Sequence, residues 1–206
     1  MMTMNGAYEI IWHGRGGQGA VTAAKILTEA AFYEGFKGVS AKPAYFSERR
    51  GAPVAVHTRI SQNPVRSYSN VAHPDIAVVL DDKLLGMVNV TSGLKEGGLL
   101  IINSTKTPQD LGLDGRFTIA ITDAFRSSEA AGLIVQGNVL ISTSILGPFI
   151  AASNLITLKS LEQALRNKFN GMSLQRNIMA VRLACQDTHV YPAETTGMQK
   201  ASRATL

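Results

Sequence analysis

Four glycines crowd into one short segment whose composition suits the binding of an anion. The segment 12–21 reads WHGRGGQGAV, and its loop residues are Gly14, Arg15, Gly16, Gly17, Gln18 and Gly19. Glycine permits positive φ angles and lets another molecule approach the bare backbone closely. A helix that begins directly behind such a turn points unpaired N–H groups at whatever lies in the turn. We therefore predict an anion-binding loop over residues 14–19.

A pair of arginines supplies a second candidate contact for an anion. Arg49 and Arg50 adjoin Gly51 in the segment SERRGAP. Their guanidinium groups offer forked donors that match the oxygens of phosphate and carboxylate. Because surface arginines are common, a solvated loop or a salt-bridged interface is the alternative interpretation of this pair.

The glycine loop departs from the two common nucleotide-binding fingerprints. Its spacing, GxGGxG, fits the dinucleotide pattern GxGxxG only loosely. The acidic residue that would hold a ribose about 20 positions later is absent, since the chain there reads KGVSAKPAYF. The Lys-Ser/Thr pair of a P-loop is absent as well. Binding of NAD or FAD and a purely structural tight turn are the alternatives to a polyanion site.

The sequence contains no self-sufficient catalytic set. Its four histidines are dispersed without the spacing of metal ligands, and the adjacent Asp81 and Asp82 are better placed to cap a helix than to act as an acid–base pair. The single cysteine, Cys185, lies in an alanine-rich helical pattern and is interpreted as a small packed residue. One cysteine cannot hold an iron–sulfur cluster or form an internal disulfide. We expect no catalytic residue and no metal site in this chain.

Alternating strands and helices must position the glycine loop. The buried pattern YEIIWH precedes the loop and the helical pattern AVTAAKILTEAAFYEG follows it, as in the opening of a βαβ unit. Further strands are predicted in VAVHTRI, DIAVVLDD, GGLLIINS and RFTIAIT, and helices in KLLGMVNVT and over residues 124–135, 139–152, 158–169 and 174–187. This alternation predicts an α/β fold, a three-layer Rossmann-like domain with a mostly parallel sheet. Ligands of such sheets lie at the carboxyl ends of the strands.

Length and composition favour one globular domain. The chain has 206 residues, of which 45% are hydrophobic, and we predict a single domain over residues 1–188 followed by a polar extension over residues 189–206. We find no signal-like N-terminus and no apolar run of membrane-spanning length, so a cytoplasmic location is expected. The net charge is +5, but the lysines and arginines are scattered, and no nucleic-acid partner is expected.

Three of these segments together resemble a known family. HGRGGQGAVTAAKILTEAAFYEG, AYFSERRGAPVAVHTRIS and HPDIAVVLDD are similar to the gamma subunit of the 2-oxoacid:ferredoxin oxidoreductases, the pyruvate and ketoisovalerate group. GRGGQG followed by ERRGAP is the specific part of this combination. The resemblance implies a subunit of a hetero-oligomeric enzyme that oxidatively decarboxylates a 2-oxo acid to an acyl-CoA.

The resemblance also implies what the partner chains carry. Thiamine diphosphate would be held by alpha and beta subunits, and iron–sulfur clusters by a beta or a ferredoxin-like delta subunit, which pass electrons to ferredoxin or another acceptor. Coenzyme A would be the polyanion at the glycine loop and at the arginine pair. Where pyruvate-type members tend to carry Gly-Pro, this chain has Phe46 and Ser47, which is compatible with a branched-chain or aryl 2-oxo acid. A stand-alone dinucleotide-binding oxidoreductase and a non-catalytic assembly subunit are the competing functions.

Overall fold

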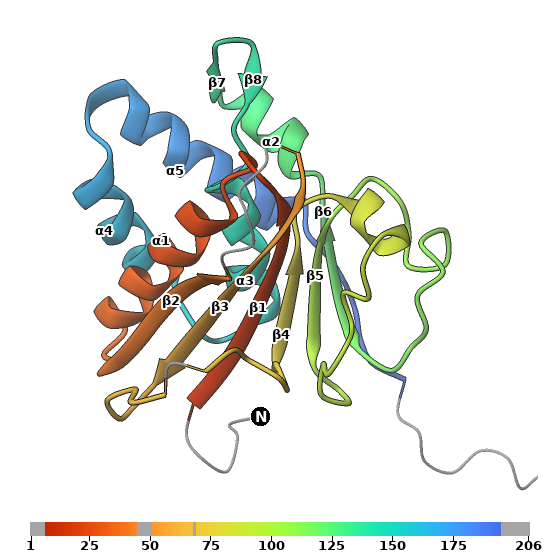
Figure 1. Cartoon of the computed structure of the whole chain (residues 1–206). Coiled ribbons are helices and arrows are strands. Elements are labelled where there is room, and N and C mark those ends of the chain that lie inside the picture. The colour runs from red at the N-terminus through yellow and green to blue at the C-terminus, as the bar shows by residue number, and fades with distance from the viewer. Residues whose placement is uncertain (1–6, 45–50, 68, 195–206) are drawn as a thin grey trace, which may run out of the picture.

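A seven-stranded mixed sheet forms the centre of the molecule (Figure 1). The computed structural model describes residues 7–44, 51–67 and 69–194. In the order of the sheet, the strands are β2 (Gly38–Ala44), β3 (Pro53–Ser61), β1 (Ala7–Arg15), β4 (Ile76–Val79), β5 (Leu99–Asn103), β6 (Thr118–Thr122) and β9 (His189–Tyr191). Five strands run in one direction, while β3 and β9 run in the other. The expected α/β fold with a mostly parallel sheet is confirmed.

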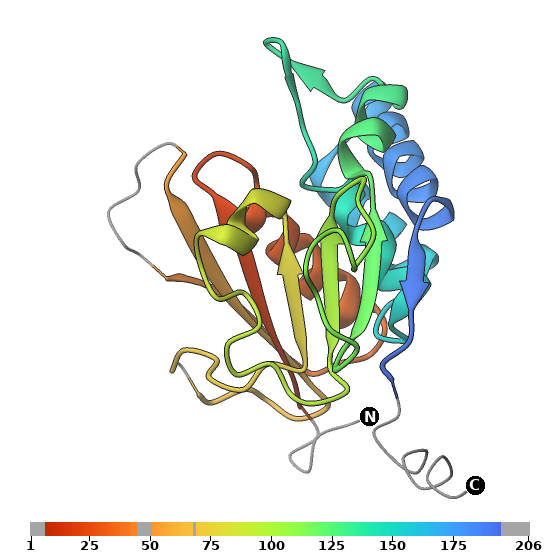
Figure 2. The same ribbon diagram turned by 90° about the vertical axis from the view of Figure 1, so that its right-hand side faces the viewer.

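The α-helices and the irregular segments cover opposite faces of this sheet (Figure 2). The helices are α1 (Ala20–Tyr33), α2 (Ala124–Ala130), α3 (Gly147–Ala152), α4 (Leu158–Lys168) and α5 (Gly171–Gln186). The other face is covered by the short 3-10 helix η1 (Asp82–Gly86) and by the long connections on either side of β5. A second 3-10 helix, η2 (Ser144–Leu146), leads into α3. The third layer is therefore present, but it contains no α-helix among the described residues.

Each face of the sheet buries its own hydrophobic core. Along β4, Ile76 and Val78 belong to the core under the helices, whereas Ala77 and Val79 belong to the core under η1. This division follows from the two-residue period of a strand, which sends alternate side chains to opposite faces. Strands buried on both faces are typical of a parallel sheet covered on both sides, which is why DIAVVL is a continuous apolar run.

Three predicted helices are wrong in extent. The pattern over residues 124–135 ends as helix α2 at Ala130, because Gly132 adopts a positive φ of 70°. A hairpin of β7 (Ile134–Val135) and β8 (Asn138–Val139) follows, so only the last part of the pattern over residues 139–152 is helical. The helix expected in KLLGMVNVT is only the 3-10 turn η1, after which Val90 is buried in the second core.

The remaining elements agree with the predictions or add to them. Helices α1, α4 and α5 lie within a few residues of their expected bounds. Strand β2, in the segment KGVSAKPA, was not predicted, and its Pro43 is tolerated because β2 is an edge strand. The first residues of the expected extension form strand β9, which pairs with β6, while residues 195–206 lie outside the described residues. Within the described ranges, no helix is long and apolar enough to cross a membrane.

Candidate functional site

The glycine loop lies at the carboxyl end of β1, directly before helix α1. Gly14 and Arg15 are the last residues of the strand, so the turn itself is residues 16–19. Gly17 and Gly19 have positive φ angles of 93° and 87°, which a residue with a Cβ atom adopts at a cost. Gly19 is the N-cap of α1 and supplies no side chain to bond the first N–H groups of the helix. The expected strand, glycine turn and helix are therefore present.

Two of the four glycines have packing reasons that involve no ligand. A Cβ atom added to Gly19 would lie 2.7 Å from the Cβ of Ser142, which is closer than real side chains approach. One added to Gly14 would lie 3.3 Å from the Cβ of Ala20. The segment behind Gly19 is fixed in turn, because the Thr143 hydroxyl donates to the Asn177 side chain at 2.8 Å. Gly19 is thus required by the contact between the loop and residues 142–143.

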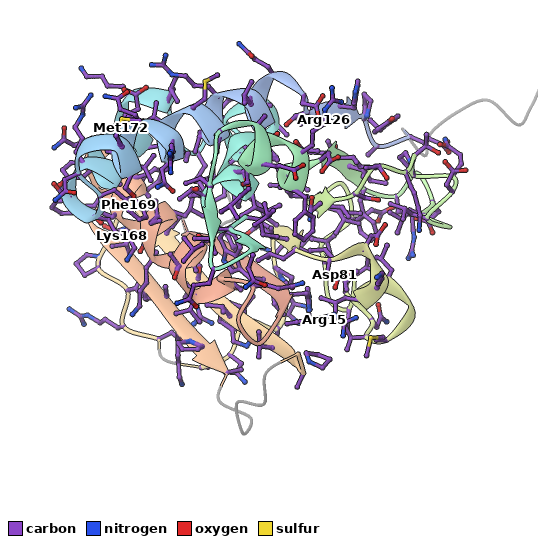
Figure 3. All side chains as sticks on the ribbon, turned by 90° about the horizontal axis from the view of Figure 1, so that it is seen from above. Arg15, Asp81, Arg126, Lys168, Phe169 and Met172 are labelled. Atoms are coloured by element: carbon purple, nitrogen blue, oxygen red, sulfur yellow. The ribbon has the colours of Figure 1, made fainter. Side chains whose placement is uncertain are left out.

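Arg15 and Gln18 join the loop to the end of strand β4. The Arg15 Nε donates to the Asp81 carboxylate at 2.7 Å, and the Gln18 amide donates to the same oxygen at 3.3 Å. The Gln18 side-chain oxygen accepts the Arg15 backbone N–H at 2.8 Å. The Arg15 Nη atoms reach the Gly51 carbonyl and the Met87 sulfur. Figure 3 shows Arg15 and Asp81 side by side next to η1. Arg15 therefore forms an ion pair within the protein in addition to being part of the loop.

Asp81 is ionised by these contacts. Burial alone would raise the pKa of its carboxyl group, but the hydrogen bonds from Arg15, the Lys83 backbone and Gln18 outweigh burial and hold the pKa below its ordinary value. The same carboxylate caps η1 through the Lys83 N–H at 3.0 Å. The expected helix-capping role of Asp81 is confirmed, and its pairing with Arg15 is an addition that the sequence did not reveal.

We predict that Asp81→Asn lowers the free energy of unfolding by about 1–3 kcal/mol near neutral pH, because the partly buried Arg15 loses its counter-charge. The lowered pKa means that this stabilisation is present above the pKa of an unfolded aspartate and is lost as the pH falls through the folded-state pKa. Chemical denaturation at several pH values measures it. Asp114→Asn is the control, since Asp114 and Arg116 form an equally short but exposed pair. Equal losses in the two variants would contradict the structural importance of the Arg15–Asp81 pair.

The chain segment after the arginine pair is bonded to the loop. Gly16 donates its N–H to the Ala52 carbonyl at 2.9 Å and accepts the Gly51 N–H at 3.1 Å. Arg49 and Arg50 themselves lie outside the described residues. These two bonds place Gly51, the residue that follows Arg50 in the chain, beside the glycine loop.

An open cleft of about 510 Å³ lies against the loop. Its lining residues are Arg15, Gly16, Gly17, Gly19, Ala20, Val21, Thr22, Pro43, Ala44, Val54, Ala55 and Val56. These residues come from the end of β1, the first turn of α1, the end of β2 and the start of β3. The cleft is therefore at the carboxyl edge of the parallel strands, as predicted. Its β2 and β3 walls were not predicted, because they depend on antiparallel pairing between distant segments.

The cleft presents backbone donors. The Arg15, Gly16 and Gln18 N–H groups are bonded within the loop region. The Gly17 N–H has no partner in the described part of the chain, and the first N–H groups of α1 have no carbonyl inside the helix to bond. This set of donors, at the positive end of a 14-residue helix, can bind an anion. We find no cluster of His, Cys, Asp and Glu among the described residues that could hold a metal ion.

Comparisons with known proteins agree with the fold. Residues 9–186 match the pyruvate ferredoxin/flavodoxin oxidoreductase family. The chain is 44% identical over 183 residues to the pyruvate/ketoisovalerate oxidoreductases common subunit gamma of Thermococcus litoralis, covering 89% of this chain and 98% of that protein. It is 42% identical over 158 residues to the pyruvate synthase subunit PorC of Methanosarcina barkeri, covering 77% and 84%.

A solved structure gives the same result. The pyruvate oxidoreductase subunit PORC of Thermotoga maritima matches with a TM-score of 0.76 at 28% identity, covering 89% of this chain and 98% of that one. The family match extends over nearly the whole helical layer and sheet, and the relatives are gamma or PorC subunits. The resemblance found in the sequence is thereby confirmed: this chain belongs to the pyruvate ferredoxin/flavodoxin oxidoreductase family.

Proposed function

We propose that the chain is the gamma subunit of a multi-subunit, CoA-dependent 2-oxoacid oxidoreductase. The enzyme oxidatively decarboxylates a 2-oxo acid, either pyruvate or a branched-chain or aryl acid, to an acyl-CoA. Support comes from the gamma and PorC subunits to which the chain is similar over most of its length. Thiamine diphosphate and the iron–sulfur clusters belong, in this proposal, to alpha, beta and delta-type partners, which deliver electrons to ferredoxin or another acceptor.

The contribution of this chain is to bind the pyrophosphate of CoA. The open cleft beside the glycine loop is the observation that carries this proposal. Its donors suit the pyrophosphate: the Gly17 N–H, which has no partner among the described residues, the N–H groups in the first turn of α1, and the second N–H of each Arg15 Nη atom. The Nε of Arg15 is held by Asp81, and its Nη atoms also contact the Gly51 carbonyl and the Met87 sulfur. Val54, Val56 and Pro43 give the cleft an apolar wall suited to the uncharged part of the same molecule. Arg49 and Arg50 are proposed as further contacts to its phosphates.

The decisive experiment uses the complete complex isolated with this chain tagged. We expect formation of acyl-CoA from at least one 2-oxo acid in a panel of pyruvate, branched-chain and aryl acids, with reduction of an added ferredoxin or artificial acceptor. The relative kcat/KM values then assign the substrate. A tagged chain that copurifies with no other subunit and instead carries NAD or FAD would establish the dinucleotide-binding alternative and overturn the proposal.

A further inference from the structure

Exposed apolar side chains gather on the outer side of helix α5 and on the β7–β8 hairpin. Met172 is 69% exposed and Val135 is 52% exposed, and Met179 and Ile134 are nearly as exposed. We define the α5–hairpin face by Ile134, Val135, Met172, Arg176 and Met179. The three α5 residues are spaced four and three positions apart, which puts them on one side of the helix. Figure 3 shows Met172 near Lys168, where α4 passes into α5.

The base of the hairpin lies against helix α5. A Cβ atom added to Gly132, two residues before β7, would lie 3.4 Å from the Arg176 Nε. Beneath this contact, Ala131, Leu133 and Ala180 form a small buried cluster of their own. The base of the hairpin is therefore fixed against α5, so the exposed side chains of the two elements are neighbours on the surface.

The hairpin is a preformed projecting arm. Ile134 pairs with Val139 and Val135 with Asn138, and Gln136 and Gly137 both have positive φ angles, as a type I′ turn requires. Consecutive strand residues point to opposite sides, so exposure of both Ile134 and Val135 means that both sides of the arm are open to solvent. Figures 1 and 2 show the arm extending beyond the sheet and the helices. So short a hairpin cannot bury its own apolar residues.

Helices α4 and α5 are positively charged. Helices α4 and α5 carry five cationic side chains and one carboxylate, a net charge of +4 within a chain whose total is +5. These residues are Lys159, Arg166, Lys168, Arg176, Arg182 and Glu162. Glu162 is shared by Arg182 and Arg166, whereas Arg176 has no ion-pair partner in the described ranges. Two such faces would repel each other, so the charge favours an acidic partner over a second copy of this chain.

We infer that the α5–hairpin face docks another subunit of the oxidoreductase complex, one that presents an apolar groove with an acidic rim. The arm would enter the groove, the methionines would pack along its border, and Arg176 would pair with a rim carboxylate. Methionine suits this role because its unbranched side chain adapts to irregular apolar surfaces. The inference rests on the chain's place in a multi-subunit enzyme and does not depend on how the glycine loop binds CoA.

The test compares face variants with matched controls in the complex expressed with all its subunits. The face variants are Met172→Ser/Met179→Ser, Ile134→Ser/Val135→Ser and Arg176→Glu. Phe32→Ser, at a position 59% exposed on α1, controls for loss of an exposed apolar group, and Lys37→Glu controls for charge reversal. Native mass spectrometry of the purified complex measures subunit loss, and thermal melting of the isolated chain measures folding.

We expect each face variant to release a partner subunit at a concentration at least about tenfold higher than the wild type and the two controls do, without a change in melting temperature. Higher salt should reproduce the Arg176→Glu effect in the wild type. Face variants that all keep every partner subunit, as the wild type does, would overturn the inference. So would an isolated chain that dimerises through this face, or one that binds vesicles of anionic lipid through Arg176 while the complex stays intact. A loss of CoA affinity without subunit loss would concern the glycine loop and not the α5–hairpin face.

Discussion

Gly17→Val should raise the apparent CoA constant of the assembled oxidoreductase by about tenfold to a hundredfold while leaving the constant for the 2-oxo acid nearly unchanged. Gly17 lines the cleft, and its N–H is without a partner in the part of the chain that the structure describes. A branched side chain there would occupy the space through which a pyrophosphate approaches the backbone donors. The measurement is CoA binding by calorimetry and steady-state kinetics on the purified complex.

The control must carry the same backbone penalty. Gly17 has a φ of 93°, so any side chain at this position strains the turn whether or not a ligand binds. Gly35, just past the other end of α1, has a φ of 97°, and an added Cβ atom would meet nothing within 4 Å. Gly35→Val therefore reproduces the strain away from the cleft. Both variants should melt at similar temperatures, and only Gly17→Val should lose affinity for CoA.

An unchanged CoA constant in a folded, fully assembled Gly17→Val complex would show that the loop does not hold CoA. The free donors would then be available to a loop of a neighbouring subunit, which is the assembly alternative. Under that alternative, Gly17→Val would release a subunit from part of the preparation, and the complex that stays intact would keep its kinetic constants. Measuring CoA binding and subunit stoichiometry on the same preparation therefore distinguishes the two roles of the loop.

The loop could be predicted from the sequence because its signals are local. Gly17 and Gly19 indicate positive φ angles, and the apolar residues on either side recur with the periods of a strand and a helix. The walls of the cleft could not be predicted, because strand β2 has a weak pattern and pairs with β3 across the undescribed segment that contains the arginine pair. The Arg15–Asp81 pair joins residues 66 positions apart, and only the parallel pairing of β1 with β4 brings them together.

The hairpin shows why a periodic pattern can mislead. Between residues 124 and 152, apolar residues recur at helical intervals, and two helices were therefore predicted. The turn at Gln136 and Gly137 and the helix end at Gly132 divide this segment instead. Ile134 and Val135 are exposed and belong to no core of this chain, so part of the pattern that resembled an amphipathic helix lies on the surface of the hairpin.

His13 should make the folded chain sensitive to mild acid. It lies on β1 on the face of the sheet away from α1, and its Nε2 is buried without a hydrogen-bond partner among the described residues. Burial first, and the charge of nearby His57 second, lower the pKa of His13 to about 4, although a hydrogen bond with the Val90 backbone opposes this. The imidazole is thus neutral in the folded chain between pH 6.5 and about 4, where it would be charged in the unfolded chain.

The sign of the effect follows from this lowered pKa. Above pH 6.5 His13 is neutral in both the folded and the unfolded state, so its protonation does not change the free energy of unfolding. As the pH falls from 6.5 towards 4, the unfolded state takes up a proton that the folded state refuses, so stability is lost progressively. The difference between 6.5 and about 4 corresponds to roughly 3 kcal/mol once the pH reaches the folded-state pKa.

Denaturation of the isolated chain at pH 7 and at pH 4.5 measures this loss. In His13→Asn, whose amide can keep the bond to the Val90 backbone, the decline should be smaller than in the wild type by about 2–3 kcal/mol. The slope that is left comes from His57, whose pKa burial also lowers, and from carboxylates such as Asp81. His73→Asn, at an exposed position, is the control and should decline as the wild type does. Identical slopes in His13→Asn and the wild type would mean that folding does not lower the pKa of His13, which would contradict this prediction.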